Sequence, residues 1–179
     1  MKKYLMFLFV AFVVGLASCS KDDVEPNEEE LITTLKVSLL AAGSTTPEVF
    51  TFKDIDGPAG NPPSQFDSII IDANKSYTAT LQFLNESVSP AEDVTVEIAT
   101  EAEDHQVYFT PAGVSITPSN LNLDSKGLPV GITSTWQTGA AAKGTLTITL
   151  IHKPGIKAAG DPISKGETDV EVAFGVRLK

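Results

Sequence analysis

The chain has 179 residues, a single cysteine, and 13 basic against 23 acidic side chains, so its formal net charge at pH 7 is -10. This acidic balance argues against nucleic acid as a partner, because phosphate backbones require a basic surface, and against electrostatic binding to anionic membranes. One cysteine cannot form an internal disulfide, so stability must come from a hydrophobic core, and the length suits one domain of ordinary size.

The first 18 residues have the features of a secretory signal peptide. Lys2 and Lys3 are followed by an apolar run over residues 4–14 and then by small residues. The run is too short for a membrane-spanning helix. Residues 16–19, Leu-Ala-Ser-Cys, resemble the lipobox of bacterial lipoproteins, in which the cysteine is lipidated on sulfur and becomes the new N-terminus. The alternative is an ordinary signal peptide that leaves Cys19 as a free thiol.

Residues 19–30 are expected to form a lipidated cysteine followed by a disordered acidic tether, because Val24 is the only apolar side chain from residue 20 to residue 30. Attachment to the membrane would then depend on acyl chains, of which one alone binds only reversibly. Residues 20–23, Ser-Lys-Asp-Asp, resemble the short acidic export tag of Bacteroidota surface lipoproteins. That resemblance implies an outer-membrane anchor with display at the cell surface; the alternative is an anchor that faces the periplasm.

Residues 31–179 are expected to form a single domain rich in β-strands. Apolar and polar residues alternate with a period of two, which is typical of half-buried strands. Loops rich in glycine and proline separate these segments, most clearly over residues 54–63 and 153–166. The predicted strands cover residues 31–39, 49–52, 67–71, 76–84, 106–110, 114–117, 132–137, 144–152 and 169–178.

The segment over residues 89–105 permits two interpretations. As a strand, Val94, Val96 and Ile98 would alternate with polar residues. As a helix, Ser89 would be the N-cap and Glu92 would complete a capping box, with Pro90 at the first helical position. We predict the helix because its start signals agree with one another.

The expected fold class is mainly β: an antiparallel two-layer β-sandwich, immunoglobulin-like, with one short crossover helix around residues 90–104. Strands and helices do not alternate along the chain, which disfavours a doubly wound nucleotide- or sugar-binding fold.

The two histidines are the best candidates for a binding site. On the helical interpretation Glu97, Glu101 and His105 follow one another at i, i+4 steps along one face, with Asp104 beside them. His152 ends a predicted strand. If that strand end packs near the helix C-terminus, the imidazoles and carboxylates can bind zinc or copper. The alternative is an exposed Glu101–His105 helix pair and a surface histidine at a strand end.

Three further features are weaker candidates. Asp54, Asp56 and Asn61 have part of the spacing of a calcium loop, but Gln65 stands where an EF-hand has glutamate; an acidic surface turn is the alternative. Residues 67–69, Asp-Ser-Ile, resemble a Bacteroidota O-glycosylation sequence with Ser68 as acceptor. Trp136, Tyr108 and Phe109 are sugar-stacking platforms or core residues.

The sequence contains no Gly-x-Ser-x-Gly elbow, no phosphate-binding glycine loop and no His-Glu-x-x-His. We therefore expect a protein that is not an enzyme, with a carboxylate-based hydrolase as the minor alternative. A structural or adhesive envelope protein that binds protein or glycan through its sheet surface is the second candidate function.

Four segments resemble a group of small Bacteroidota lipoproteins, over residues 28–179 as a whole. They are residues 28–35 (EEELITTL), 52–57 (FKDIDG), 84–93 (LNESVSPAED), and 127–131 (GLPVG) followed by 152–154 (HKP). Members are often encoded beside TonB-dependent outer-membrane receptors, and some carry the label of a type 1 periplasmic binding fold, which the strand pattern here contradicts. The resemblance implies an uptake-associated surface lipoprotein with such a receptor as partner; it transfers no site residue.

Overall fold

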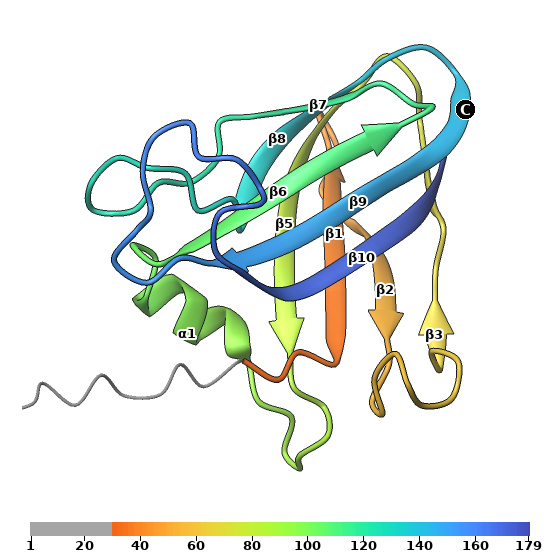
Figure 1. Cartoon of the computed structure of the whole chain (residues 1–179). Coiled ribbons are helices and arrows are strands. Elements are labelled where there is room, and N and C mark those ends of the chain that lie inside the picture. Colours follow the sequence, from red (N-terminus) through yellow and green to blue (C-terminus); the bar gives the residue numbers. More distant parts are fainter. Residues whose placement is uncertain (1–29) are drawn as a thin grey trace, which may run out of the picture.

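Residues 30–179 are described in the computed structural model of this protein, and they form two β-sheets and one short helix (Figure 1). The expected signal peptide, Cys19 and all of the tether except Glu30 lie outside the described residues. The fold is mainly β, with two layers that are not closed into a barrel, and the predicted β-sandwich is confirmed.

The first sheet has six antiparallel strands. Its centre is formed by β1, which pairs with β2 on one side and β5 on the other. In spatial order the strands are β3 (Gln65–Phe66), β2 (Glu48–Lys53), β1 (Thr34–Ala41), β5 (Ser76–Leu84), β8 (Thr133–Thr138) and β7 (Ile116–Ser119).

The second sheet has four strands, and its long hairpin of β9 and β10 crosses the first sheet in Figure 1. The order is β4 (Ile69–Ile71), β10 (Glu167–Leu178), β9 (Ala142–His152) and β6 (His105–Ala112). Only β4 runs parallel to its neighbour. The strand predicted over residues 67–71 corresponds to β4, which begins two residues later than predicted. β3 was not predicted; it belongs to the other sheet, and the chain passes between the two strands at Asp67 and Ser68.

The core lies between the two sheets and is filled by alternate side chains of the strands, as the period of two requires. Leu35, Val37 and Leu39 of β1 face Leu146, Ile148 and Leu150 of β9 in one buried cluster. Trp136 is fully buried, its ring meets Phe109 edge-on at 5.5 Å between centroids, and its indole N–H donates to Ser134 Oγ at 2.9 Å. Trp136 is thus a core residue, and sugar stacking on it is excluded in this fold.

The helix is present but begins later than its sequence signals indicate. α1 spans Val94–Thr100, and its N-cap is Asp93, whose carboxylate accepts a hydrogen bond from the Thr95 N–H at 3.1 Å. The capping box that begins at Ser89 is wrong, because Glu92 forms a two-bond bridge with Asn85 in the extended chain before the helix. Val94 and Ile98 are buried, while Thr95 Oγ1 exchanges hydrogen bonds with the backbone of Phe83 in β5.

Truncation of the tryptophan tests this core. Trp136→Ala should lower the free energy of unfolding by about 3–5 kcal/mol, because it leaves a large cavity, whereas Trp136→Phe should cost only about 1–2 kcal/mol. Chemical denaturation followed by circular dichroism measures both. In the wild type, acrylamide should barely quench the tryptophan fluorescence; efficient quenching would show that the indole is exposed and the packing described here is incorrect.

Candidate metal site

One end of the sandwich gathers both histidines and four carboxylates from five parts of the chain. α1 contributes two glutamates, the first residue of β6 and the last of β9 contribute the imidazoles, the start of β10 contributes an aspartate, and the chain before β1 contributes a glutamate. In Figure 1 the first described residues run beside α1 at this end. We call this group the His–carboxylate cluster: Glu30, Glu97, Glu101, His105, His152 and Asp169.

The two imidazoles are held together by the register of β6 and β9. His105 and His152 are directly opposite one another in this antiparallel pair. Their rings stack with 4.5 Å between centroids and 4° between planes. Ligand atoms of Glu101, His105 and His152 all lie within 4.8 Å of one another, so the structure brings together the three residues that the sequence singled out.

The hydrogen bond of His105 decides which ring nitrogen is available. Nδ1 lies 3.1 Å from the carbonyl oxygen of Glu101, which can only accept, so Nδ1–H is the donor. In the neutral ring the lone pair is then on Nε2, which lies 3.3 Å from Glu30 Oε1 and 3.9 Å from Asp169 Oδ2. Metal-binding histidines are commonly oriented in this way, with one nitrogen fixed by a carbonyl and the other directed at the ligand site.

Glu30 and Asp169 were missed by the sequence analysis. Asp169 lies at an irregularity of β10, where the register with β9 shifts between Thr168 and Val170, and such bulges redirect a side chain. Glu30 lies in an acidic run that has the composition of a tether. No periodicity or motif marks either residue, and both reach the site through tertiary packing, with side chains that are 8% and 2% exposed respectively.

Glu97 belongs to the cluster and Asp104 does not. Ligand atoms of Glu30, Glu97 and Glu101 lie within 4.8 Å of one another, which places Glu97 beside the histidines. Asp104 instead secures the next loop, since its carboxylate accepts from the Gly155 N–H at 2.8 Å and its carbonyl from the Lys153 N–H at 2.6 Å.

The electrostatics of the cluster favour a positive charge within it. Burial lowers the pKa of His105, but the neighbouring Glu30 carboxylate, the Glu101 carbonyl and the charge of Asp169 raise it by more, so the net shift is upward. The Nε2 contact with Glu30 is not aligned as a hydrogen bond, so the charge of the carboxylate is the better account of its effect. Burial, followed by the charges of Glu30 and Glu101, raises the pKa of Glu97.

A pocket of about 330 Å³ lies beside the cluster and provides access to it. Glu30 and Asp169 form part of its wall, together with Leu31 and with Asp54 to Pro58 of the long loop. Within that loop Asp56 Oδ2 accepts from the backbone and side-chain N–H groups of Asn61 at 3.0 and 2.7 Å, and Asp54 Oδ1 accepts from the Gly57 N–H at 3.1 Å. These bonds fold the loop on itself, and Asp54, Asp56 and Asn61 are in none of the ligand groups found over residues 30–179.

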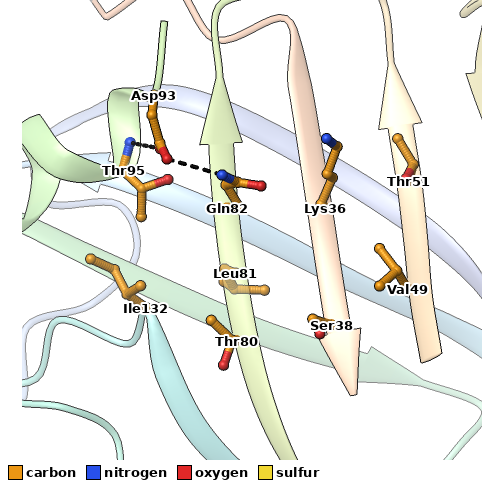
Figure 2. A pocket seen from close by; sticks show the side chains of 10 residues that line it. All are labelled: Lys36, Ser38, Val49, Thr51, Thr80, Leu81, Gln82, Asp93, Thr95 and Ile132. Carbon is orange, nitrogen blue, oxygen red and sulfur yellow. Dashed lines mark hydrogen bonds between the residues drawn. The ribbon is translucent and has the colours of Figure 1, made fainter. Parts of the chain in front are cut away.

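The larger hollow, about 610 Å³, lies on the outward face of the six-stranded sheet, and no histidine lines it (Figure 2). Lys36, Ser38, Thr51 and Thr80 line it beside the apolar Val49, and Gln82 donates to Asp93 at 2.9 Å along one edge. It is open and mixed in polarity.

Ser68 is exposed, and its glycosylation stays a prediction.

Comparisons with protein-family models, with curated proteins and with solved structures return no match for this chain. Across residues 30–179, no helix is both long and apolar enough to cross a bilayer.

The raised pKa of His105 predicts a pH dependence for the metal-free protein. Folding favours the protonated ring, so this contribution to the free energy of unfolding is fully present below pH 6.5 and is lost as pH rises through the higher pKa of the folded state. The groups facing the ring are Glu30, Asp169, His152 and the Glu101 carbonyl. Urea unfolding in EDTA between pH 5.5 and 8.5 should therefore show stability falling with pH in the wild type relative to His105→Gln. Parallel pH profiles for the two proteins would contradict this assignment.

Proposed function

We propose that this protein is a lipid-anchored binding accessory of the outer membrane, displayed at the cell surface, that captures a transition-metal ion, Zn²⁺ or Cu²⁺, at the His–carboxylate cluster. The observation that carries the proposal is the convergence of two imidazoles and several carboxylates, in which His105 Nε2, His152 Nδ1 and both oxygens of Glu30 are buried without a hydrogen-bond partner in the described chain. A TonB-dependent receptor is the proposed recipient, on the strength of the sequence resemblance.

Buried polar atoms are hydrogen-bonded in the great majority of cases. In the described part of the chain His105 Nε2, His152 Nδ1 and both Glu30 carboxylate oxygens are buried and lack a hydrogen-bond partner. His105 shares one ligand group with Glu30 and Asp169 and another with Glu101 and His152, and all of these side chains are of the types that bind metals. One cation bound between His105 and Glu30 would satisfy the buried nitrogen and a buried carboxylate oxygen at the same time.

The distances suit a small tetrahedral ion. Zinc lies about 2.0–2.2 Å from nitrogen and oxygen ligands, so two tetrahedral ligands are about 3.3–3.6 Å apart. His105 Nε2 and Glu30 Oε1 are 3.3 Å apart, which is within this range, and Asp169 Oδ2 is 3.9 Å from the same nitrogen, a few tenths of an ångström beyond it. Imidazole with carboxylate, and no thiolate, is a ligand set for zinc or copper.

The position of the cluster in the chain suits a membrane accessory. Glu30 is 11 residues beyond Cys19, and a fully extended segment of that length spans at most about 40 Å. If Cys19 carries the lipid, the site is held within that distance of the bilayer. An ion bound there is close to any receptor in the same membrane.

The second candidate function, adhesion through the sheet surface, is favoured by one observation. The outward face of β1, β2 and β5 is hollowed by the 610 Å³ groove, which hydroxyl and amide side chains line (Figure 2). The adhesion hypothesis predicts a partner that binds without metal. Lys36 lines the groove, so Lys36→Glu should weaken the binding of this partner and leave metal affinity unchanged.

Metal binding is tested by calorimetry on the mature chain carrying Cys19→Ser, titrated with Zn²⁺ and Cu²⁺. We expect binding that is lost, by a factor of about 100 or more, in the His105→Ala/His152→Ala double variant. Asp104→Asn is the matched control, because this carboxylate flanks the cluster without joining it. Co²⁺ absorption in the wild type reports the coordination directly. Absence of binding to the wild type, or equal binding to the double variant, would remove the proposal.

The anchor is tested separately. Cys19→Ala should move the protein from the detergent phase to the aqueous phase in a Triton X-114 partition and should abolish labelling by a palmitate analogue, because the acyl chains are the proposed membrane contact. Retention of the Cys19→Ala protein in the detergent phase would show that another segment holds it.

A further inference from the structure

We propose that Glu30 bridges the transition-metal site to a second site, built from oxygen ligands alone, which binds a hard divalent cation such as Ca²⁺ between Glu30, Glu97 and Glu101. The bridging role rests on the function proposed above. The oxygen site itself rests on the placement of the three carboxylates.

The geometry suits a larger ion than zinc. Glu97 of α1 and Glu101, the C-cap of this helix, are one helical turn apart, and Glu30 approaches them from the chain before β1. One oxygen from each of the three lies within 4.8 Å of the others. Calcium binds oxygen at about 2.3–2.6 Å, so ligands on opposite sides of one ion can be about 5 Å apart. The three side chains can therefore surround a calcium ion without rearrangement of the backbone.

Two of the three carboxylates in this half of the cluster, Glu97 and Glu101, have no ion-pair partner within residues 30–179. The three carboxylates nevertheless converge. Like charges at this separation repel unless one of them is protonated or a cation lies between them. The upward shift in the pKa of Glu97 reflects the same repulsion in addition to burial.

Glu30 supplies the independent observation that points to a ligand. Its side chain is only 8% exposed, and neither carboxylate oxygen has a hydrogen-bond partner in the described chain. Oε1 lies 3.3 Å from His105 Nε2, and Oε2 is buried without a partner of its own, so in the proposed arrangement Oε2 is the oxygen shared with Glu97 and Glu101. A carboxylate that presents one oxygen to each of two ligand groups has the arrangement of a bridging ligand between two cations.

A solvated acidic helix face is the simpler explanation for Glu97 and Glu101, because both are exposed. It does not account for Glu30, whose side chain is buried beside those two carboxylates and whose Oε2 has no hydrogen-bond donor within the described chain. The two halves of the cluster also differ in access: His105 is fully buried, whereas Glu97 and Glu101 are open to solvent and leave room for water to complete the six to eight oxygen ligands of calcium.

The test is calorimetric titration of the Zn²⁺-loaded mature chain, carrying Cys19→Ser, with CaCl₂. We expect one calcium per chain and a loss of calcium affinity of at least about tenfold in Glu97→Gln and in Glu101→Gln, since each removes one of three charged ligands. Zinc affinity in Glu97→Gln should stay within about twofold of the wild type. Glu30→Gln should weaken both ions, and Glu48→Gln, which removes the same charge from the far end of β2, should change neither.

The outcomes separate the two proposals. Three outcomes would overturn the second site and leave the proposed function intact. The chain could bind zinc but no calcium, or bind calcium with an affinity that Glu97→Gln and Glu101→Gln leave unchanged. In the third outcome the two ions compete for one site. Calcium binding that is weakened by Glu97→Gln in a protein that binds no zinc would establish the oxygen site and remove the transition-metal function.

Discussion

The antiparallel pairing of β6 with β9 is the constraint on which the site depends. It extends from His105 opposite His152 at one end to Ala112 opposite Thr145 at the other, in unbroken register. A slip by one residue would separate the imidazoles and would turn the buried side chains of both strands to the wrong face. The same alternation that fills the core therefore fixes the two rings against each other. The register of β6 and β9 thus determines both the packing between the sheets and the geometry of the site.

Two lysines of the loop after β9, Lys153 and Lys157, form hydrogen bonds with the turn between α1 and β6, and their side chains are buried. The ammonium group of Lys157 donates to the carbonyl of Ala102 at 2.7 Å and to Asp124 at 2.8 Å. Lys153 is fully buried, with its ammonium group near the hydroxyl of Tyr108 and above the Tyr108 ring, and its backbone N–H bonds Asp104. Charges removed from water are stable only when they are paired in this way. These contacts fix the loop over the turn that carries Glu101 and His105.

The His–carboxylate cluster contains buried ionisable side chains and more carboxylates than imidazoles. Elsewhere in the described chain buried ammonium groups lie near carboxylates, as in the pair of Lys157 and Asp124. In the cluster four carboxylates meet two imidazoles, and the chain that leads toward the proposed anchor supplies one of those carboxylates. A site of this composition is most stable when positive charge is added to it. The cation proposed for this site would therefore stabilise the folded chain when it binds.

The sequence by itself determined the fold class, because a period of two in apolar residues and the glycine and proline loops between segments are local features that strands and turns require. It also identified Glu101, His105 and His152 as candidates from residue chemistry and helical spacing. The start of α1 was misplaced because Ser89 and Glu92 satisfy a local capping pattern that the bridge between Asn85 and Glu92 overrides. Only the tertiary structure decided that the histidines stack and that Glu30 and Asp169 join them. Strand register, a bulge in β10 and the path of the chain before β1 bring together residues more than 100 positions apart, and no short-range pattern in the sequence encodes such distances.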